Sequence, residues 1–163
     1  MIETRVLTPE DWTIWRELRL AALSEAGHAF GAQLAEWQGD GDREERWRAR
    51  LAIPGSYNVV VTLEGQPVGM ASGMRTDHSG IVEMISMYVA PRGRGRGAGD
   101  LLVAAVERWA RQLGADTLRL AVVEGNRNAS VLYERNGFRD TGEQGGLMPD
   151  GIRRERIMAK RLA

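Results

Sequence analysis

Segment 91–99 is a turn of alternating glycines and arginines, and it constrains the fold more than any other part of the chain. An apolar, β-branched run at 81–89 leads into this turn, and an amphipathic helical pattern follows it. A strand that enters a helix through such a turn leaves several backbone N–H groups pointing at one spot, in front of the positive end of the helix dipole. Glycine allows a ligand to approach the backbone closely, and the arginines add charge. The sequence therefore predicts a phosphate or pyrophosphate site here.

Two common phosphate-binding motifs do not fit this turn. A P-loop needs Lys followed by Ser or Thr after its last glycine, whereas Gly99 is followed by Asp100 and Leu101. The dinucleotide-binding pattern Gly-x-Gly-x-x-Gly lacks its third glycine from every starting position in the turn. A flexible basic turn that contacts nucleic acid is the alternative that this segment alone leaves open.

Composition narrows the class of protein. With 163 residues, 43% hydrophobic and 27% charged, the chain is expected to form one domain spanning 1–163. A net charge of +0 argues against wholesale nucleic-acid binding. The absence of cysteine excludes disulfides, and two distant histidines, His28 and His78, do not suggest a zinc site. No apolar run approaches the length of a membrane span, so we expect a cytoplasmic protein with no membrane partner.

Hydrophobic periodicity and turn residues predict alternating strands and helices. Strands are expected at 2–7, 57–63, 68–74, 81–89, 117–123, 138–141 and 152–160. Helices are expected from Thr8 onward, from an Asp42 cap to just before Pro54, at 99–113 and at 126–136. A glycine-rich loop is expected at 141–151.

Two motifs in this order resemble the signatures of one superfamily. Arg94-x-x-Gly97-x-Gly99 is similar to the Gln/Arg-x-x-Gly-x-Gly/Ala motif of the GCN5-related N-acetyltransferases, the GNAT superfamily. Residues 126–133 read Asn-x-x-Ala-x-x-Leu-Tyr and are followed by Gly-Phe, as in the second signature of that superfamily. The resemblance covers 81–141. It implies an α/β (α+β) three-layer fold, with a mixed, mostly antiparallel sheet flanked by helices.

The resemblance also implies an activity. The family transfers an acetyl group from acetyl-CoA directly to a primary amine, so the chain is expected to be an N-acetyltransferase acting on a small molecule or a peptide, without a metal or nucleic acid. A non-catalytic acetyl-CoA-binding sensor on the same fold is the alternative, and a homodimer is left open.

The family pattern assigns a set of residues to the cofactor. The turn would bind the pyrophosphate mainly through its backbone, and the preceding strand would run beside the pantetheine arm like an added strand. Several of these residues have an ordinary structural reading as well, because Met87 and Val89 fit a core and Asn126 is a natural helix N-cap. The implied cofactor-binding residues are Met87, Tyr88, Val89, Arg94, Gly95, Arg96, Gly97, Ala98, Gly99, Asn126 and Tyr133.

Two residues are candidates for proton transfer. Tyr133 is the candidate general acid, because a phenol with a pKa of about 10 is protonated at neutral pH and can protonate a leaving thiolate. Glu83 lies on the strand ahead of the turn, in register with the strand glutamate that some family members use as general base. A buried helix tyrosine and a salt-bridged strand glutamate are the structural alternatives. Glu36, Glu45 and His28 are reserve candidates for the base.

The acceptor is expected to contact the segments at 27–41 and 141–151, which vary most among such enzymes. Phe30 and Trp37 could pack against an apolar acceptor, and Glu36 or Asp40 could attract a cationic amine.

Overall fold

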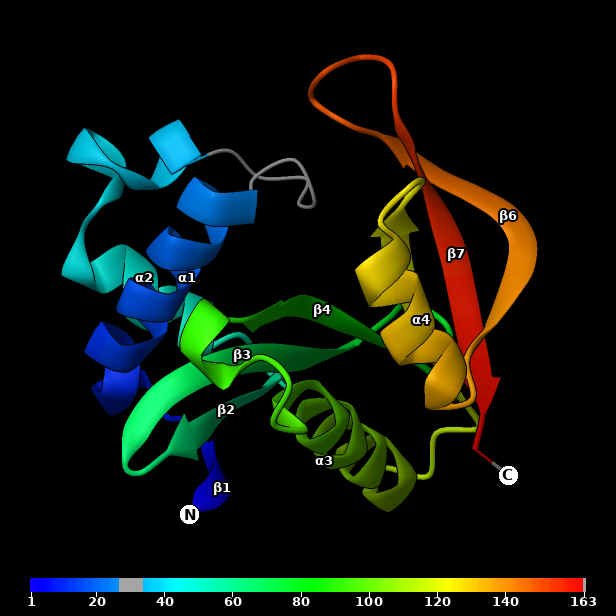
Figure 1. The fold of residues 1–163 in the computed structure, drawn as a ribbon, viewed down its shortest axis with the longest axis horizontal. Helices are drawn as coiled ribbons and strands as arrows, with labels where there is room; N and C mark the ends of the chain where they lie inside the picture. The colour runs from blue at the N-terminus through cyan, green and yellow to red at the C-terminus, as the bar shows by residue number, and fades with distance from the viewer. Residues whose placement is uncertain (27–33, 163) are drawn as a thin grey trace.

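The computed structural model describes residues 1–26 and 34–162, in which one mixed sheet lies between two layers of helices (Figure 1). Its strands are β1 Ile2–Val6, β2 Tyr57–Leu63, β3 Gln66–Arg75, β4 Ile81–Val89, β5 Thr117–Val123, β6 Arg139–Leu147 and β7 Arg154–Arg161. Its α-helices are α1 Trp12–Ala26, α2 Glu44–Leu51, α3 Ala98–Gln112 and α4 Arg127–Arg135. Short 3-10 turns are η1 Pro9–Asp11, η3 Leu34–Trp37, η4 Gly39–Gly41 and η5 Pro91–Gly93.

The sheet has the strand order β1-β2-β3-β4-β5-β7-β6. Every neighbouring pair is antiparallel except β4 and β5, which are parallel. A parallel pair needs a crossover, and α3 supplies it between these two strands. This arrangement confirms the expected α/β (α+β) three-layer fold with a mixed, mostly antiparallel sheet.

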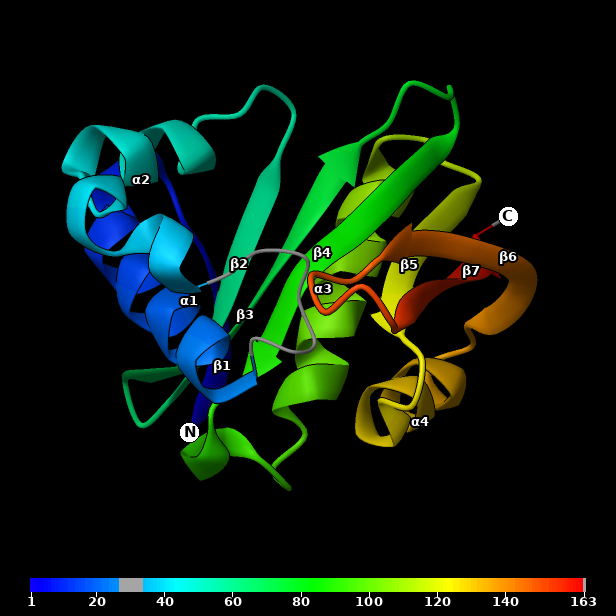
Figure 2. The same cartoon turned by 90° about the horizontal axis from the view of Figure 1, so that it is seen from above.

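The two helical layers cover opposite faces of the sheet, as Figure 2 shows from above. Strand β2 shows why helices cover both faces: Val59 and Val61 pack into the core beneath α3, whereas Val60 packs toward α1 and α2. Side chains alternate between the faces of a strand, so an unbroken apolar run is buried on both sides. The helices contribute Leu102 and Val106 to the first core and Trp15 and Trp47 to the second.

The sequence-based prediction for 138–151 is wrong in one respect. Strand β6 continues to Leu147, through residues that were expected to form a loop, and β7 begins at Arg154 rather than at 152. The pairing of β6 with β7 shifts register on both sides of Gln144, and Gly142 has a φ of +85°. Backbone pairing with β7 thus outweighs the low strand propensity of glycine, which is tolerated in an irregular edge strand.

The helix starts also differ in detail from expectation. A turn of 3-10 helix precedes α1, and Thr8 N donates to Asp11 Oδ2 at 2.9 Å across it. Asp42 does not cap α2, because Arg43 occupies the N-cap position. The Asp42 carboxylate instead accepts hydrogen bonds from Arg16 and from Trp47 Nε1. An ion pair with α1 has therefore replaced the local cap.

Candidate active site

Strands β4 and β5 are paired only at their beginnings. The register joins Ile81 to Thr117, Val82 to Leu118 and Glu83 to Arg119, and no further β4–β5 pair exists in the described chain. A cavity of about 620 Å³ lies where the strands diverge, with 84–89 in one wall and residues of β5 and α4 in the other. Beyond residue 83, the backbone of β4 on this side is available to an extended ligand.

A bulge in β4 accompanies this divergence. Met70 pairs with Tyr88 and Ser72 with Ile85, so two β4 residues lie opposite Ala71 of β3. One of the two, Ser86, has a φ of +58°, which is uncommon for a residue other than glycine. Such bulges bend a strand and re-aim its side chains next to functional sites. The bulge lies in the cavity wall, where β4 and β5 are no longer paired.

The cavity brings together many of the residues that the sequence singled out. Those in its walls are Glu83, Met87, Tyr88, Val89, Arg94, Asn126 and Tyr133. Residues 95–99 are not in its walls and follow Arg94 directly, up to the start of α3. Glu36, Asp40, Trp37 and Glu45 do not line it, and His28 and Phe30 lie outside the described residues. Trp37 packs on Trp47 with a centroid distance of 4.6 Å.

The glycine-rich turn presents a row of backbone donors. Gly95 and Gly97 have φ values of +73° and +81°, and no atom lies within 4 Å of where their Cβ atoms would be. The N–H groups from 95 to 100 have no acceptor in the described part of the chain, and Leu101 N makes the first bond of α3, to Gly97 O. Together with the dipole of a 15-residue helix, these donors form a site suited to a phosphate group.

Gly99 makes a close contact with the neighbouring helix α4. A Cβ at this position would lie 3.0 Å from Cδ2 of Leu132, a residue of α4 in the cavity wall. The start of α3 therefore packs directly against α4, and this contact places the turn beside the cavity.

Arg94 is held over the end of β4. Its Nε donates to Val89 O at 3.1 Å, and its guanidinium forms an ion pair with Glu25 of α1. Glu25 also accepts a hydrogen bond from the Tyr88 hydroxyl, and these two donors lower the pKa of its carboxyl group. Burial and the nearby Glu25 raise the pKa of Tyr88 to about 12. Glu25 could not be identified from the sequence, because no motif links α1 to β4.

Tyr133 is buried in the cavity wall, with 7% of its surface exposed. Its ring packs edge-on against Phe138 at a centroid distance of 6.0 Å. Burial raises the pKa of the phenol above its ordinary value, so the hydroxyl is protonated at neutral pH. A protonated phenol on a residue of the cavity wall can act as a proton donor.

Asn126 caps α4, as its position predicted. Its side-chain oxygen accepts a hydrogen bond from Ala129 N at 3.3 Å. The residue also lines the cavity. The cap places the first turn of α4 against the opening.

Glu83 is in an ion pair rather than isolated. Its Oε1 accepts a hydrogen bond from Arg119 Nη2 at 2.8 Å. Glu155 of β7, a second carboxylate that the sequence analysis missed, also lines the cavity. No linear pattern marks Glu155, because it reaches the site only through the pairing of β7 with β5.

Comparison with known proteins identifies the family. The family model described as the acetyltransferase (GNAT) family matches residues 13–138. The chain belongs to this family. It is therefore an acyltransferase of the GNAT type, in agreement with the two sequence motifs.

The relatives of this GNAT protein include an uncharacterised N-acetyltransferase of Bacillus subtilis, YhfO, which is 32% identical over 128 residues, 76% of this chain and 84% of the relative. An aminoglycoside N(6')-acetyltransferase type 1 of Stenotrophomonas maltophilia is 26% identical over 146 residues, 84% of this chain and 86% of the relative. Among solved structures, yncA, a putative acetyltransferase from Salmonella typhimurium with its cofactor acetyl-CoA, has a TM-score of 0.79 at 22% identity and covers 100% of this chain and 95% of its own. This last likeness shows the fold.

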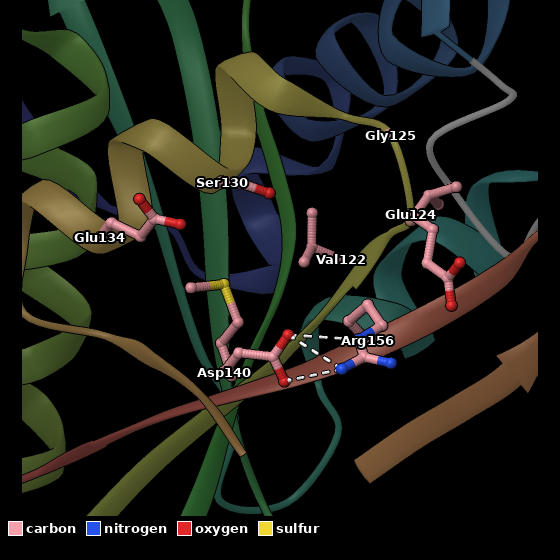
Figure 3. Close-up of a pocket in the computed structure, with 9 residues that line it drawn as sticks. Val122, Glu124, Gly125, Ser130, Glu134, Asp140 and Arg156 are labelled. Atoms are coloured by element: carbon pink, nitrogen blue, oxygen red, sulfur yellow. Dashed lines mark hydrogen bonds and ion pairs between the residues drawn. The ribbon is translucent and has the colours of Figure 1, made fainter. Parts of the chain in front are cut away.

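A second cavity of the GNAT protein, of about 340 Å³, lies beside α4 and contains none of the predicted residues (Figure 3). An ion pair between Asp140 and Arg156, 3.2 Å long, is drawn there, with Glu124 and Glu134 nearby. Only a variable position of the second motif, Ser130, reaches it, and the glycine-rich turn does not, so we assign the active site to the larger cavity. Within residues 1–26 and 34–162 we find no group of three or more metal-ligating side chains, and no helix there is long and apolar enough to span a membrane.

Proposed function

We propose that the chain is an N-acetyltransferase that transfers the acetyl group of acetyl-CoA directly to a primary amine of a small molecule or a peptide. One observation carries the proposal. The cavity between the diverging strands has Val89 and Arg94 in its wall, next to the anion-binding turn, and also Tyr133 and Glu83. A site for a phosphate-bearing thioester and two proton-transfer groups are thus contiguous.

The residues present fit coenzyme A. The unpaired N–H groups of 95–99 would hold the pyrophosphate, with Arg94 and Arg96 adding positive charge. Met87, Tyr88 and Val89 would run beside the pantetheine arm, whose amides can pair with the free side of β4. Asn126 and Tyr133 would complete the wall from α4. When bound, the group supplies an acetyl thioester, which is open to attack by an amine.

Tyr133 would protonate the departing sulfur. Its pKa is raised by burial, which keeps the proton on the phenol until a stronger base forms beside it. The hydroxyl makes no hydrogen bond to another described residue, so its proton is available to a ligand in the cavity.

An acceptor amine must first become neutral. An alkylammonium has a pKa of about 10.4 and is charged at neutral pH, so a base must take one proton before attack. We propose the carboxylates of the cavity wall for this step, with Glu83 the one predicted from the sequence.

The names of two relatives suggest acceptors to try first. One is an aminoglycoside acetyltransferase. Another, from Bos taurus, is a thialysine N-epsilon-acetyltransferase, 38% identical over 60 residues, 37% of this chain and 35% of the relative. Both names specify an amine on a small cationic molecule, which supports a small-molecule acceptor for this chain.

An acceptor screen with a binding control tests the proposal. Thiol release from acetyl-CoA would be followed with kanamycin, thialysine, spermidine and an alanine-initiated peptide, and coenzyme A binding would be measured by calorimetry. Binding together with acetylated product, identified by mass spectrometry, supports the proposal. Tight binding without turnover on any amine indicates the sensor instead, and absence of binding overturns both. Cell fractionation and ultracentrifugation would test the predicted cytoplasmic location and the homodimer.

A further inference from the structure

Three charged side chains share one face of the sheet beside the cavity: Glu83 of β4, Arg119 of β5 and Glu155 of β7. Successive side chains of a strand point to opposite faces of the sheet. The residues on either side of Glu83 and of Arg119 face the core beneath α3, so Glu83 and Arg119 lie on the other face. Met158, three positions after Glu155, also faces that core, so Glu155 lies on the same face as Glu83 and Arg119. Those core residues are Val82, Met84, Leu118, Leu120 and Met158. Glu83 and Glu155 both line the cavity.

The two carboxylates have different surroundings. Glu83 is bound by Arg119 at 2.8 Å, so a proton arriving on it would cost an ion pair. Glu155 forms no ion pair with a described residue, and the backbone N–H of Gly146 lies near its carboxylate. Burial raises the pKa of Glu155, the Gly146 N–H lowers it, and the charge of Glu83 raises it again, with a net upward shift.

The two charged residues that flank Glu155 on β7 do not share its face of the sheet. Arg154 and Arg156 are its neighbours along the strand and project to the other face. There Arg156 pairs with Asp140 of β6, at 3.2 Å. Glu124 follows the end of β5 and lines the second cavity with Arg156.

The charged residues of β5 and α1 near the cavity are Arg119, Glu25 and Arg19. Arg119 of β5 is held by Glu83. From α1, Glu25 is bound by Tyr88 and Arg94. Arg19 of α1 is also in the cavity wall, and burial lowers its pKa to about 10. No charged residue of α4 lines this cavity.

We infer that Glu155 receives the proton of the acceptor amine, and that Glu83, held in place by Arg119, is a positioning residue beside it. The inference rests on the proposed function and deepens it. A carboxylate without a cationic partner has room for an ammonium group, which supplies the missing counter-charge. The acceptor is then a cationic primary amine that binds on this face of the sheet.

The proton balance of the step closes. The ammonium gives one proton to Glu155, which later releases it to water. The neutral nitrogen forms a bond to the acetyl carbon as the carbon–sulfur bond breaks. Tyr133 gives its hydroxyl proton to the departing sulfur, which becomes the thiol of the product. The second proton of the nitrogen then replaces the proton that Tyr133 gave up.

The pH dependence of kcat/KM separates the two carboxylates. If Glu155 is the base, kcat/KM should fall at low pH as Glu155 becomes protonated; this fall is the acidic limb of the profile. Because the charge of Glu83 raises the pKa of Glu155, Glu83→Gln should move the acidic limb to lower pH without abolishing it. Glu155→Gln should remove that limb, lower kcat/KM near neutral pH about 10²–10⁴-fold, and recover rate at high pH where the amine is neutral. Glu3→Gln, an exposed strand glutamate of β1, is the matched control and should behave as wild type. An acidic limb lost in Glu83→Gln and kept in Glu155→Gln would overturn the inference.

A titration without an acceptor tests the same assignment independently of turnover. In the full chain carrying ¹³C-labelled glutamate carboxyl groups, the Glu155 resonance is identified by its loss in Glu155→Gln. It should titrate above the ordinary glutamate value of about 4.3, and at lower pH in Glu83→Gln. Titration of Glu155 at or below that value would refute the inference. Calorimetry with coenzyme A should give wild-type affinity for Glu155→Gln, whereas failure of the proposed function would abolish binding in the wild type itself.

Discussion

The Tyr88 hydroxyl donates a hydrogen bond to Glu25, 63 residues earlier in the chain, with an oxygen–oxygen distance of 2.6 Å. The same carboxylate holds the guanidinium of Arg94. Through these contacts α1 is joined to the end of β4 and to Arg94, the first residue of the proposed anion-binding turn. The orientation of Arg94 therefore depends on a helix that contains neither motif.

Glu25→Gln should weaken coenzyme A binding about two- to five-fold, the effect of a partly exposed ion pair. The Glu25 pKa is lowered in the folded protein, so its contribution to stability is present above the ordinary glutamate pKa and is lost as pH falls through the lowered value. Calorimetry and thermal unfolding between pH 7 and pH 3 measure both effects. A wild-type affinity in the variant would show that Arg94 is positioned without Glu25.

Gly97→Glu should abolish coenzyme A binding while the protein stays folded. The substitution brings a negative charge to the predicted pyrophosphate site, and the space around the Cβ position is open. Gly97→Ala is the matched control. It adds no charge but puts a side chain at φ +81°, so it should cost about 1 kcal/mol of stability and retain most of the affinity. Binding that survives the glutamate variant would place the phosphates elsewhere.

Tyr133→Phe should lower turnover about 10²–10⁴-fold with coenzyme A affinity nearly unchanged, because a general acid acts on the leaving group rather than in binding. The ring keeps its edge contact with Phe138, so the melting temperature should also be close to that of wild type. Steady-state kinetics, calorimetry and thermal unfolding on one preparation check all three. Wild-type turnover in the variant would show that Tyr133 only packs in the core and that water protonates the thiolate.

Asn126→Ala should destabilise the protein by about 0.5–2 kcal/mol through loss of the α4 cap. Asn126→Asp keeps an oxygen for Ala129 N and should restore stability. Denaturant unfolding measures the contribution of the cap to the free energy of unfolding. Calorimetry measures the affinity for coenzyme A, and so tests whether Asn126 also contacts the cofactor. If the residue also contacts the cofactor, the aspartate should fold normally yet bind coenzyme A more weakly, because it brings a negative charge next to the phosphate-binding turn. Wild-type affinity in both variants would contradict that role.

Local patterns predicted most of the helices and strands. The helix after the turn, its buried stripe and the Asn126 cap follow from 3.6-residue periodicity and capping chemistry, which act within a few residues. The predictions were wrong where contacts between residues far apart in sequence outweighed local preferences. Asp42 binds Arg16 of α1 instead of capping α2, and β6 runs through Gly142 because β7 pairs with it.

Motifs and local patterns were enough to identify the family, the glycine turn that opens α3, and the positions of Tyr133 and Glu83 along the chain, since each depends on short-range chemistry. The separation of β4 and β5 after three pairs, and the position of β7 next to β5, are visible only in the folded sheet. Those two facts create the cavity and bring Glu155 to it from 72 positions beyond Glu83. Strand order and register are set by the packing of the whole sheet between its helices, so residues far apart in sequence meet in a site that no local pattern encodes.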